Sequence, residues 1–367
     1  MDPVLTELNE KDDILKFTIS NINVSLANAI RRIILSDIPC IVFETLPHEK
    51  NNSTFYVNTS KFNNEILKQR LACIPIHMDL ETPIDDYILE VDVKNDSDSV
   101  IYVTTADFKI KNINSEKYLQ DDDLKQIFPP NAITNHFIEF CRLLPKLADN
   151  IPGQHLKFSC KFSISTAKEN GSYNVVSLCT YRNTPDYVKI EDEKKVIIEK
   201  LKSKYEDEQL INLELNDWRT LTAKRIFEEN SFDFTIKSLG VFTNKNILEK
   251  AINIIIERLK NIKEIFTQNN KYITNSNNTI PNSYDIILEN EDFTIGKIIE
   301  FILYNNYYNG ESTLSYCGFY KPHPHLNISI IRIAYKDEQP LDSAQRYIVE
   351  SCLFAIDIYE KLLKQLA

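Results

Sequence analysis

The chain has 367 residues, of which 43% are hydrophobic, which is enough for two or three folded domains and too much for wholesale disorder. Its formal net charge of −11 argues against a surface devoted to gripping phosphates, because such surfaces are rich in Lys and Arg. The seven dispersed cysteines form no closely spaced pair, which is typical of buried thiols in a reducing compartment.

The first helical pattern follows a strand. Residues 14–22 alternate apolar and polar, which predicts a half-buried strand. Over residues 25–38 the apolar positions recur in steps of three and four, which predicts an amphipathic helix. We expect Ser25 to cap this helix and Pro39 to end it.

Residues 47–185 have a different pattern. Strand-like stretches are separated by turn clusters such as NDSD and FPPN, which predicts a mainly antiparallel sheet inserted between two parts of another unit. After this segment the chain becomes charged and helical over residues 186–212.

A second strand and a long helix follow. Residues 232–239 alternate again, and from residue 248 to 266 the apolar side chains fall at steps of 4, 3, 4, 3 and 4. A helix of this length needs a partner surface to bury its whole apolar stripe.

Residues 267–283 are polar and rich in Asn, which predicts a linker. Beyond it, residues 284–367 repeat the earlier order of strand, capped helix, strands and long closing helix, with Thr294 as the expected cap. Each unit ends in a helix too apolar to stand alone, so we expect the two units to pack helix against helix in a pseudo-twofold pair. A flexible linker of this length spans roughly 20–24 Å, which favours pairing within one chain.

One motif resembles a known family. The sequence SLANAIRRIILSDIP at residues 25–39 is similar to the signature of the bacterial RNA polymerase alpha subunit, the archaeal D subunit and the third-largest subunit of eukaryotic RNA polymerase II. The sequence RLACIP at residues 70–75 resembles the second motif of these subunits, in which Gly usually replaces Ala72. Residues 152–154 and 167–173 resemble their inserted domain, although the second loop departs from the usual pattern.

The segment after the linker resembles a different subunit. The sequences EDFTIG at residues 291–296 and GFYKPHP at residues 318–324 are similar to the eleventh subunit of the eukaryotic enzyme, or archaeal L. In cells, the two subunits that these segments resemble are separate chains. In some large DNA viruses they are fused, as the resemblance implies for this chain. An Asn-, Ile- and Lys-rich composition suits an AT-rich genome of that kind.

The resemblance implies an α+β fold with two alpha-subunit-like dimerisation modules. It predicts a D-like module at residues 1–46 and 186–266, an inserted β-rich domain at 47–185, a linker at 267–283, and an L-like module at 284–367. It also predicts a platform on which two large catalytic subunits and smaller polymerase subunits assemble.

The resemblance assigns residues to three roles. The expected large-subunit interface consists of Asn28, Arg31, Arg32 and Arg70. The expected dimerisation core consists of Leu26, Ile30, Ile33, Ile34, Leu248, Ile252, Ile255, Leu259, Ile298, Ile299, Ile302, Ile348, Cys352 and Ala355. The expected structural motif positions are Pro39, Pro75, Gly296, Pro322, His323 and Pro324.

The sequence offers little for chemistry of its own. His323 and His325 could share a strand face, but two ligands are too few for a metal, so we expect a turn. Relatives of the D type often carry a metal-binding cysteine cluster, which Cys141, Cys160 and Cys179 are too scattered to reproduce, so we expect no metal and no cofactor. The acidic run at residues 121–123 is expected to be a solvated loop.

We therefore predict a subunit that is not an enzyme by itself and that meets DNA and RNA only through the polymerase. The competing interpretations are a self-contained scaffold or regulatory binding protein with the same paired core, and, less favoured, an enzyme using the two histidines. No apolar run approaches the about 20 residues of a membrane helix, so we expect a soluble, intracellular protein with no membrane contact. A viral protein would be found in host cytoplasm and virion, and a cellular one in nucleus or cytoplasm with the polymerase.

Overall fold

A computed structural model describes residues 1–146, 148, 151–277 and 279–366. The chain divides into two compact units, each of which is described by itself. The first contains residues 1–34, 178–237 and 244–367, and the second contains residues 35–177 and 238–243.

The first unit contains two sheets. In one, strand order is β1 (Val4–Lys11), β2 (Ile14–Ser20), β12 (Phe227–Ser238) and β11 (Val176–Pro185). Both β1 and β12 pair antiparallel with β2, and Phe17 lies opposite Phe234 with the two rings stacked at 5.1 Å. Both rings lie on the buried face of the sheet. Alternate residues of a strand point to the same face, which explains the alternating pattern of residues 14–22.

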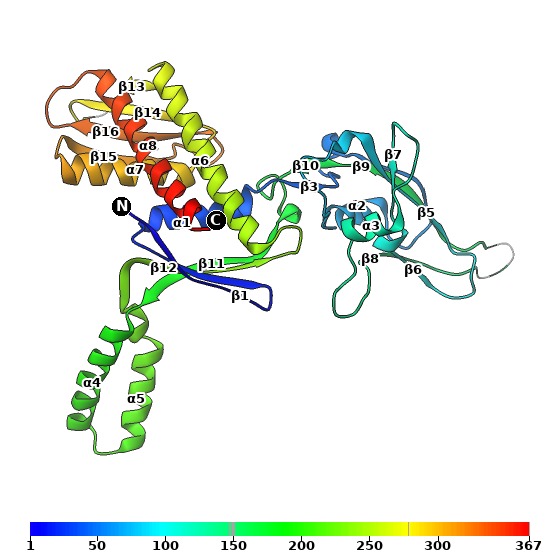
Figure 1. Cartoon of the computed structure of the whole chain (residues 1–367), viewed down its shortest axis with the longest axis horizontal. Coiled ribbons are helices and arrows are strands. Elements are labelled where there is room, and N and C mark those ends of the chain that lie inside the picture. The colour runs from blue at the N-terminus through cyan, green and yellow to red at the C-terminus, as the bar shows by residue number, and fades with distance from the viewer. Residues whose placement is uncertain (147, 149–150, 278, 367) are drawn as a thin grey trace. The chain divides into compact units, whose positions relative to one another are not determined.

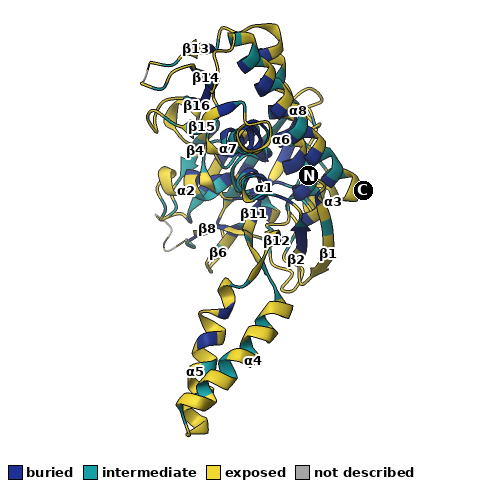
Figure 2. Ribbon diagram, turned by 90° about the vertical axis from the view of Figure 1, so that its left-hand side faces the viewer, coloured by how far each residue is buried: buried dark blue, intermediate teal, exposed yellow. Residues whose placement is uncertain are grey.

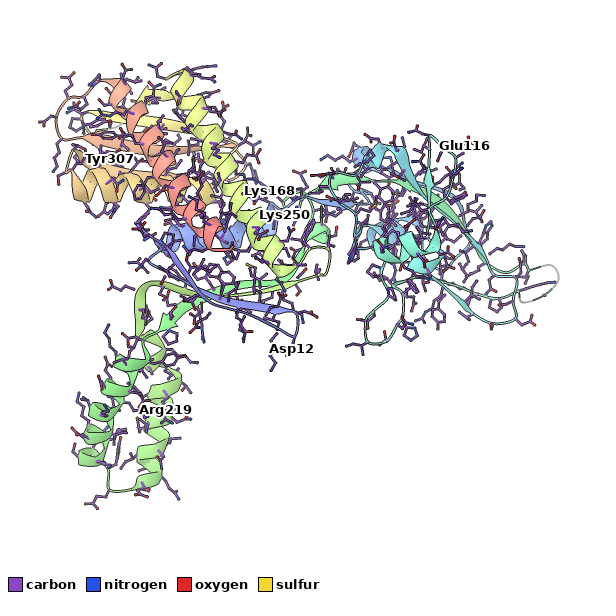
Figure 3. All side chains as sticks on the ribbon, viewed as in Figure 1. Asp12, Glu116, Lys168, Arg219, Lys250 and Tyr307 are labelled. Carbon is purple, nitrogen blue, oxygen red and sulfur yellow. The ribbon has the colours of Figure 1, made fainter. Side chains whose placement is uncertain are left out.

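The other sheet has the order β13 (Ile273–Asn275), β14 (Ser283–Glu289), β16 (Ile328–Tyr335) and β15 (Leu314–Tyr320). All of its pairings are antiparallel. Helix α7 (Phe293–Leu303) follows β14 and continues into a π-helical turn, Tyr304–Gly310, whose Tyr307 is marked in Figure 3. Part of the segment expected to be a linker is therefore ordered as the edge strand β13.

Four helices carry the hydrophobic contact between the two sheets of this unit. Helix α1 (Val24–Ser36) follows β2, and the long helices α6 (Asn244–Gln268) and α8 (Leu341–Leu366) pack against each other (Figure 1). Helix α7 packs on α8 and touches α6. The facing sides of these helices are buried, whereas their outer sides are exposed (Figure 2).

A helical hairpin leaves the end of β11 and returns to β12. It consists of α4 (Tyr187–Lys204) and α5 (Glu208–Thr220), and the Asp186 amide donates to the Ile226 carbonyl at its neck. Within α4 no residue is buried, and within α5 only Trp218 is, so this hairpin is the most exposed helical part of the unit (Figure 2). The charged pattern of residues 186–212 predicted helix here, and the structure confirms it.

The second unit is built mainly of strands. A sheet of order β4 (Ser53–Asn58), β9 (His155–Lys161), β5 (Tyr87–Lys94) and β7 (Lys109–Asn112) is joined by the pairs β3 (Cys40–Val42) with β10 (Ser163–Ser165) and β6 (Ile101–Thr104) with β8 (Glu139–Leu143). Helices α2 (Asn64–Ala72) and α3 (Asp121–Ile127) complete it. Short 3-10 turns lie at His48–Lys50, Ile84–Asp86, Thr105–Asp107 and Gly171–Tyr173, with a further one, Ala223–Arg225, in the first unit.

The core of the second unit is aromatic. Phe108 meets Phe128, Phe140 and Phe158 edge to face at 5.5–6.2 Å, and the four side chains are at most 2% exposed. Edge-to-face contacts of this kind add to the burial energy of each ring. The second unit therefore has a hydrophobic core of its own.

Three local expectations are corrected by the structure. The cap of α1 is Asn23, whose side chain accepts the Ser25 amide at 2.9 Å, and the cap of α7 is Asp292, which accepts the Thr294 amide at 2.8 Å. The acidic run at 121–123 is the first turn of α3, because carboxylates are favoured at a helix N-terminus.

Candidate subunit-docking site

Helix α1 carries a half-buried, pre-oriented arginine. Arg31 donates from Nε to the Asn28 side-chain oxygen at 2.9 Å, and both residues are half-buried. Within the described part of the chain, neither terminal nitrogen of Arg31 makes a hydrogen bond. A guanidinium held in this way presents a planar fork that fits a carboxylate or two backbone carbonyls.

A buried thiol lies beside this arginine. Burial raises the pKa of the Cys179 thiol on β11 to about 12, and the Arg31 guanidinium acts weakly in the opposite direction. Cys179 is therefore an uncharged packing residue, and the positive charge of Arg31 is not neutralised by it.

The neighbouring Arg32 has a different environment. Its Nε donates to the Thr294 hydroxyl at 2.9 Å and a terminal nitrogen donates to the Asp292 carboxylate at 3.1 Å. Because Asp292 also caps α7, Arg32 joins α1 to the first turn of that helix. The ion pair is about one-third exposed, so its main effect is to fix orientation and its energy is about 1 kcal/mol or less.

Arg70 lies in the second unit, at the end of α2. Its Nε and a terminal nitrogen donate to the carbonyls of Phe140 and Glu139 at 2.7 and 2.6 Å, and its guanidinium lies over the Phe62 ring. These bonds fasten α2 to strand β8. Of the four residues expected at the large-subunit interface, Arg32 and Arg70 are thus engaged inside the chain, and Asn28 orients Arg31.

The residues expected to form the dimerisation core are all buried. They lie on α1, α6, α7 and α8, and none is more than 1% exposed: Leu26, Ile30, Ile33, Ile34, Leu248, Ile252, Ile255, Leu259, Ile298, Ile299, Ile302, Ile348, Cys352 and Ala355. Polar contacts lie around them. The fully buried Tyr359 donates its hydroxyl to the Leu26 carbonyl at 3.0 Å, and Gln345 donates to the Phe266 carbonyl.

The motif residues Pro39 and Pro75 lie near helix ends, and Gly296 lies at a close packing contact. Pro39 separates the end of α1 from β3, and Pro75 follows the last turn of α2. Gly296 packs so closely under the Phe319 ring that a Cβ there would lie 2.0 Å from a ring carbon.

The Pro322–His323–Pro324 turn is exposed between β15 and β16. The His325 amide donates to His323 Nδ1 at 3.2 Å, and the two rings meet edge to face. Among the described residues, no three His, Cys, Asp or Glu side chains are grouped so as to hold a metal ion. No described helix combines the length and apolar character needed to span a bilayer.

Sequence reasoning missed the caps Asn23 and Asp292, the role of Gln365 on α8, and the hydrogen bond of Tyr359, which it had placed only in the apolar stripe of that helix. The caps had a usable signal, because an Asx residue stands two positions before each expected Ser or Thr. The other two offered none, since their partners lie more than 300 residues away.

The model of the RNA polymerase Rpb3/Rpb11 dimerisation domain matches residues 16–259, which is well over half of the chain and includes α1, the second unit and most of α6. The chain belongs to this family.

Individual relatives cover a similar span. The DNA-directed RNA polymerase subunit Rpo3 of Pyrococcus furiosus is 23% identical over 68% of this chain and 92% of its own length, and Rpo3 of Archaeoglobus fulgidus is 22% identical over 73% and 99%. A subunit of DNA-directed RNA polymerases I and III of Dictyostelium discoideum, rpac1, is 26% identical over 70% and 80%. The family match ends at residue 259, so the likeness of residues 284–367 to the eleventh subunit stays a prediction.

Proposed function

We propose that the chain is a non-catalytic assembly subunit of a multi-subunit DNA-directed RNA polymerase. The family match, the relatives named as polymerase subunits and the helix α1 with its oriented Arg31 support this assignment. In this role the chain binds two large catalytic subunits and smaller subunits, and the large subunits carry the nucleotidyl transfer. A chain of net charge −11 meets nucleic acid only through that complex.

The proposed platform is a pseudo-twofold pair of modules inside one polypeptide. The two sheets support it, because β1-β2-β12-β11 and β13-β14-β16-β15 have the same order when each strand is matched to its counterpart. Helices α1 and α7 then correspond, as do α6 and α8, and the caps Asn23 and Asp292 fall at matching positions.

We accordingly propose a D-like module at 1–46 and 186–266 with an inserted domain at 47–185, and an L-like module at 284–367 after a connecting segment at 267–283. Fusion of the two modules supports a viral origin, with a place in the host cytoplasm and virion.

Docking is proposed to depend on Arg31. Asn28 holds its Nε, so little side-chain entropy remains to be lost when the terminal nitrogens bind a partner's carboxylate or carbonyls. Arg32 acts differently in this proposal, by fixing α1 against α7 through Asp292.

The test is co-expression of the chain with the two large subunits of its polymerase, followed by purification through a tag on this chain. Wild type is expected to recover both, and Arg31→Ala to lower recovery of a large subunit about tenfold, which corresponds to about 1.4 kcal/mol. Arg31→Lys is expected to restore little, because an ammonium lacks the fork. Arg219→Ala, at an exposed position on the hairpin (Figure 3), is the matched control.

The outcomes separate the assignments. If wild type recovers neither large subunit, the chain is a self-contained scaffold and the polymerase role is wrong. If wild type recovers both and Arg31→Ala does so equally, the polymerase role stands and the docking role of Arg31 is wrong. Melting curves of all variants check that the fold is intact.

A further inference from the structure

The edge strand β1 begins at a contact with the closing helix α8. Pro3, just before β1, is buried although its neighbours Asp2 and Val4 are exposed. Strand β1 lies at the edge of its sheet, so its outer backbone groups have no strand partner. Residues near the end of α8 take that place.

Gln365 makes the central contact. Its Oε1 accepts the Leu5 amide at 2.8 Å, and its Nε2 donates to the Pro3 carbonyl at 2.8 Å. A carboxamide that accepts from one residue and donates to the residue two positions earlier reproduces what a neighbouring strand offers an edge. The side chain of Gln365 therefore acts as a one-residue strand partner for β1.

Two further contacts lie beside it. Lys361, one turn earlier on α8, pairs with Asp2 at 2.7 Å and with Asp357 at 2.7 Å. The side chain of Asp2 is 82% exposed, so this ion pair is weak and the carboxamide bonds carry most of the contact. One and a half turns before Gln365, the Tyr359 hydroxyl binds the Leu26 carbonyl of α1. The end of α8 is thus held on one side by β1 and on the other by α1.

We propose that Asp2, Pro3, Leu5, Lys361 and Gln365 form a latch that keeps the last two turns of α8 seated on α1. The latch couples the order of residues 2–5 to the seating of the closing helix. Helix formation alone does not ensure this seating, because the last turn of a helix frays when its final carbonyls lack partners. All contacts of the latch lie inside the first unit, so it operates whichever partner the chain binds.

The rest of β1 fits this interpretation. The strand carries a bulge between Thr6 and Asn9, with Glu7 at a φ of 54°, and its turn to β2 contains Asp12 (Figure 3). A bulge and exposed charges are ways in which an edge strand avoids pairing with other chains. Beyond the bulge the edge is therefore self-protected, and before it the latch supplies the protection.

Hydrogen–deuterium exchange on the full chain tests the latch, read on peptides covering residues 2–8 and 358–366. Gln365→Ala is expected to speed exchange at least tenfold in both peptides, since it removes the carboxamide bonds to Leu5 and Pro3. Gln365→Glu keeps the acceptor for Leu5 and loses the donor to Pro3, so its effect is expected to be smaller in both. Lys361→Ala is expected to change exchange less than threefold.

Gln268→Ala is the matched control. Gln268 ends α6 as Gln365 nearly ends α8, is exposed, and its side chain makes no hydrogen bond within the described residues. This variant should leave both peptides as in wild type. If Gln365→Ala unfolds the chain, the milder Gln365→Glu replaces it, and faster exchange than wild type in both peptides is then the expected result.

Two results would overturn the latch. One is exchange within twofold of wild type in both peptides of Gln365→Ala. The other is faster exchange in residues 2–8 alone, because Gln365 would then only cover the strand edge and the seating of α8 would not depend on it.

Discussion

Gly296 offers a sharp test of how the α7 helix packs on its sheet. A Cβ built on Gly296 would lie 2.0, 2.4 and 2.7 Å from three carbons of the Phe319 ring, whereas ordinary contacts are 3.4 Å or more. The ring cannot move freely, because it stacks edge to face on Phe293 at 5.1 Å and lies under the Lys297 ammonium. The Phe319 amide is also fixed by the Glu300 carboxylate at 3.0 Å.

Two opposing effects decide whether Gly296→Ala raises or lowers the free energy of unfolding. Replacing a mid-helix Gly with Ala stabilises a helix by about 1 kcal/mol through backbone entropy. Overpacking a filled site costs about 1–3 kcal/mol, and a contact of 2.0 Å lies at the upper end of that range. We therefore expect a net loss of about 1–2 kcal/mol in the free energy of unfolding.

The double variant separates the two effects. In a Phe319→Ala background the ring is gone, so Gly296→Ala should reverse sign and stabilise the chain by up to about 1 kcal/mol. Thermal and urea unfolding of the four proteins of this cycle provide the measurement. Gly171→Ala, where a Cβ would meet no atom within 4 Å, is the control. The reasoning is wrong if Gly296→Ala stabilises the chain while Phe319 is present.

Two further predictions concern a thiol and an ion pair. Of the seven free cysteines only Cys73 is exposed. A thiol reagent at pH 8 should therefore label one equivalent within minutes, and Cys73→Ser should abolish this fast phase. Three fast equivalents in wild type would contradict the burial of the other cysteines. Arg332 binds Asp285 through two bonds of 2.6 and 2.8 Å and lowers the pKa of that carboxyl. Asp285 therefore stabilises the fold above the unfolded-state pKa of about 3.9, and this contribution is lost as the pH falls through the lower folded-state pKa. Asp285→Asn should cost about 1–3 kcal/mol in urea unfolding at pH 7 and progressively less below pH 4; a cost that does not depend on pH would refute the linkage.

Much of the fold could be predicted because long helices repeat their signal. The apolar steps from residue 248 to 266 mark a face that the structure buries along α6, from Leu248 to Phe266. Alternation over residues 14–22 likewise identified β2, and its inward residues Leu15, Phe17 and Ile19 are at most 2% exposed. A periodic pattern repeats the same signal at several positions, so one residue that departs from it does not obscure the helix or strand.

Helix caps and very short strands depend on one or a few residues, so no repeated pattern marks them, and they were harder to predict. Ser25 and Thr294 were favoured as caps by residue type, but Asn23 and Asp292 stand two positions earlier and their side chains accept the amides of those residues. Both residue types cap helices well, so type alone does not choose between them. The strand β13 was missed because its three residues, two of them exposed, lie in an Asn-rich stretch.

The two adjacent arginines of α1 show why a site cannot be read from its motif alone. Successive residues on a helix point about 100° apart, so Arg31 and Arg32 face different surroundings whatever the motif says. What separates them is Asp292, which lies 260 residues further along the chain and binds Arg32. The side-chain hydrogen bond that Arg31 makes within the described residues goes to Asn28, three positions before it on the same helix. Thr294 and Asp292 bind Arg32, whereas Arg31 is the arginine for which the docking role is proposed. Variants of the two should therefore fail in different assays: Arg31→Ala in recovery of a large subunit, Arg32→Ala in the stability of the chain itself.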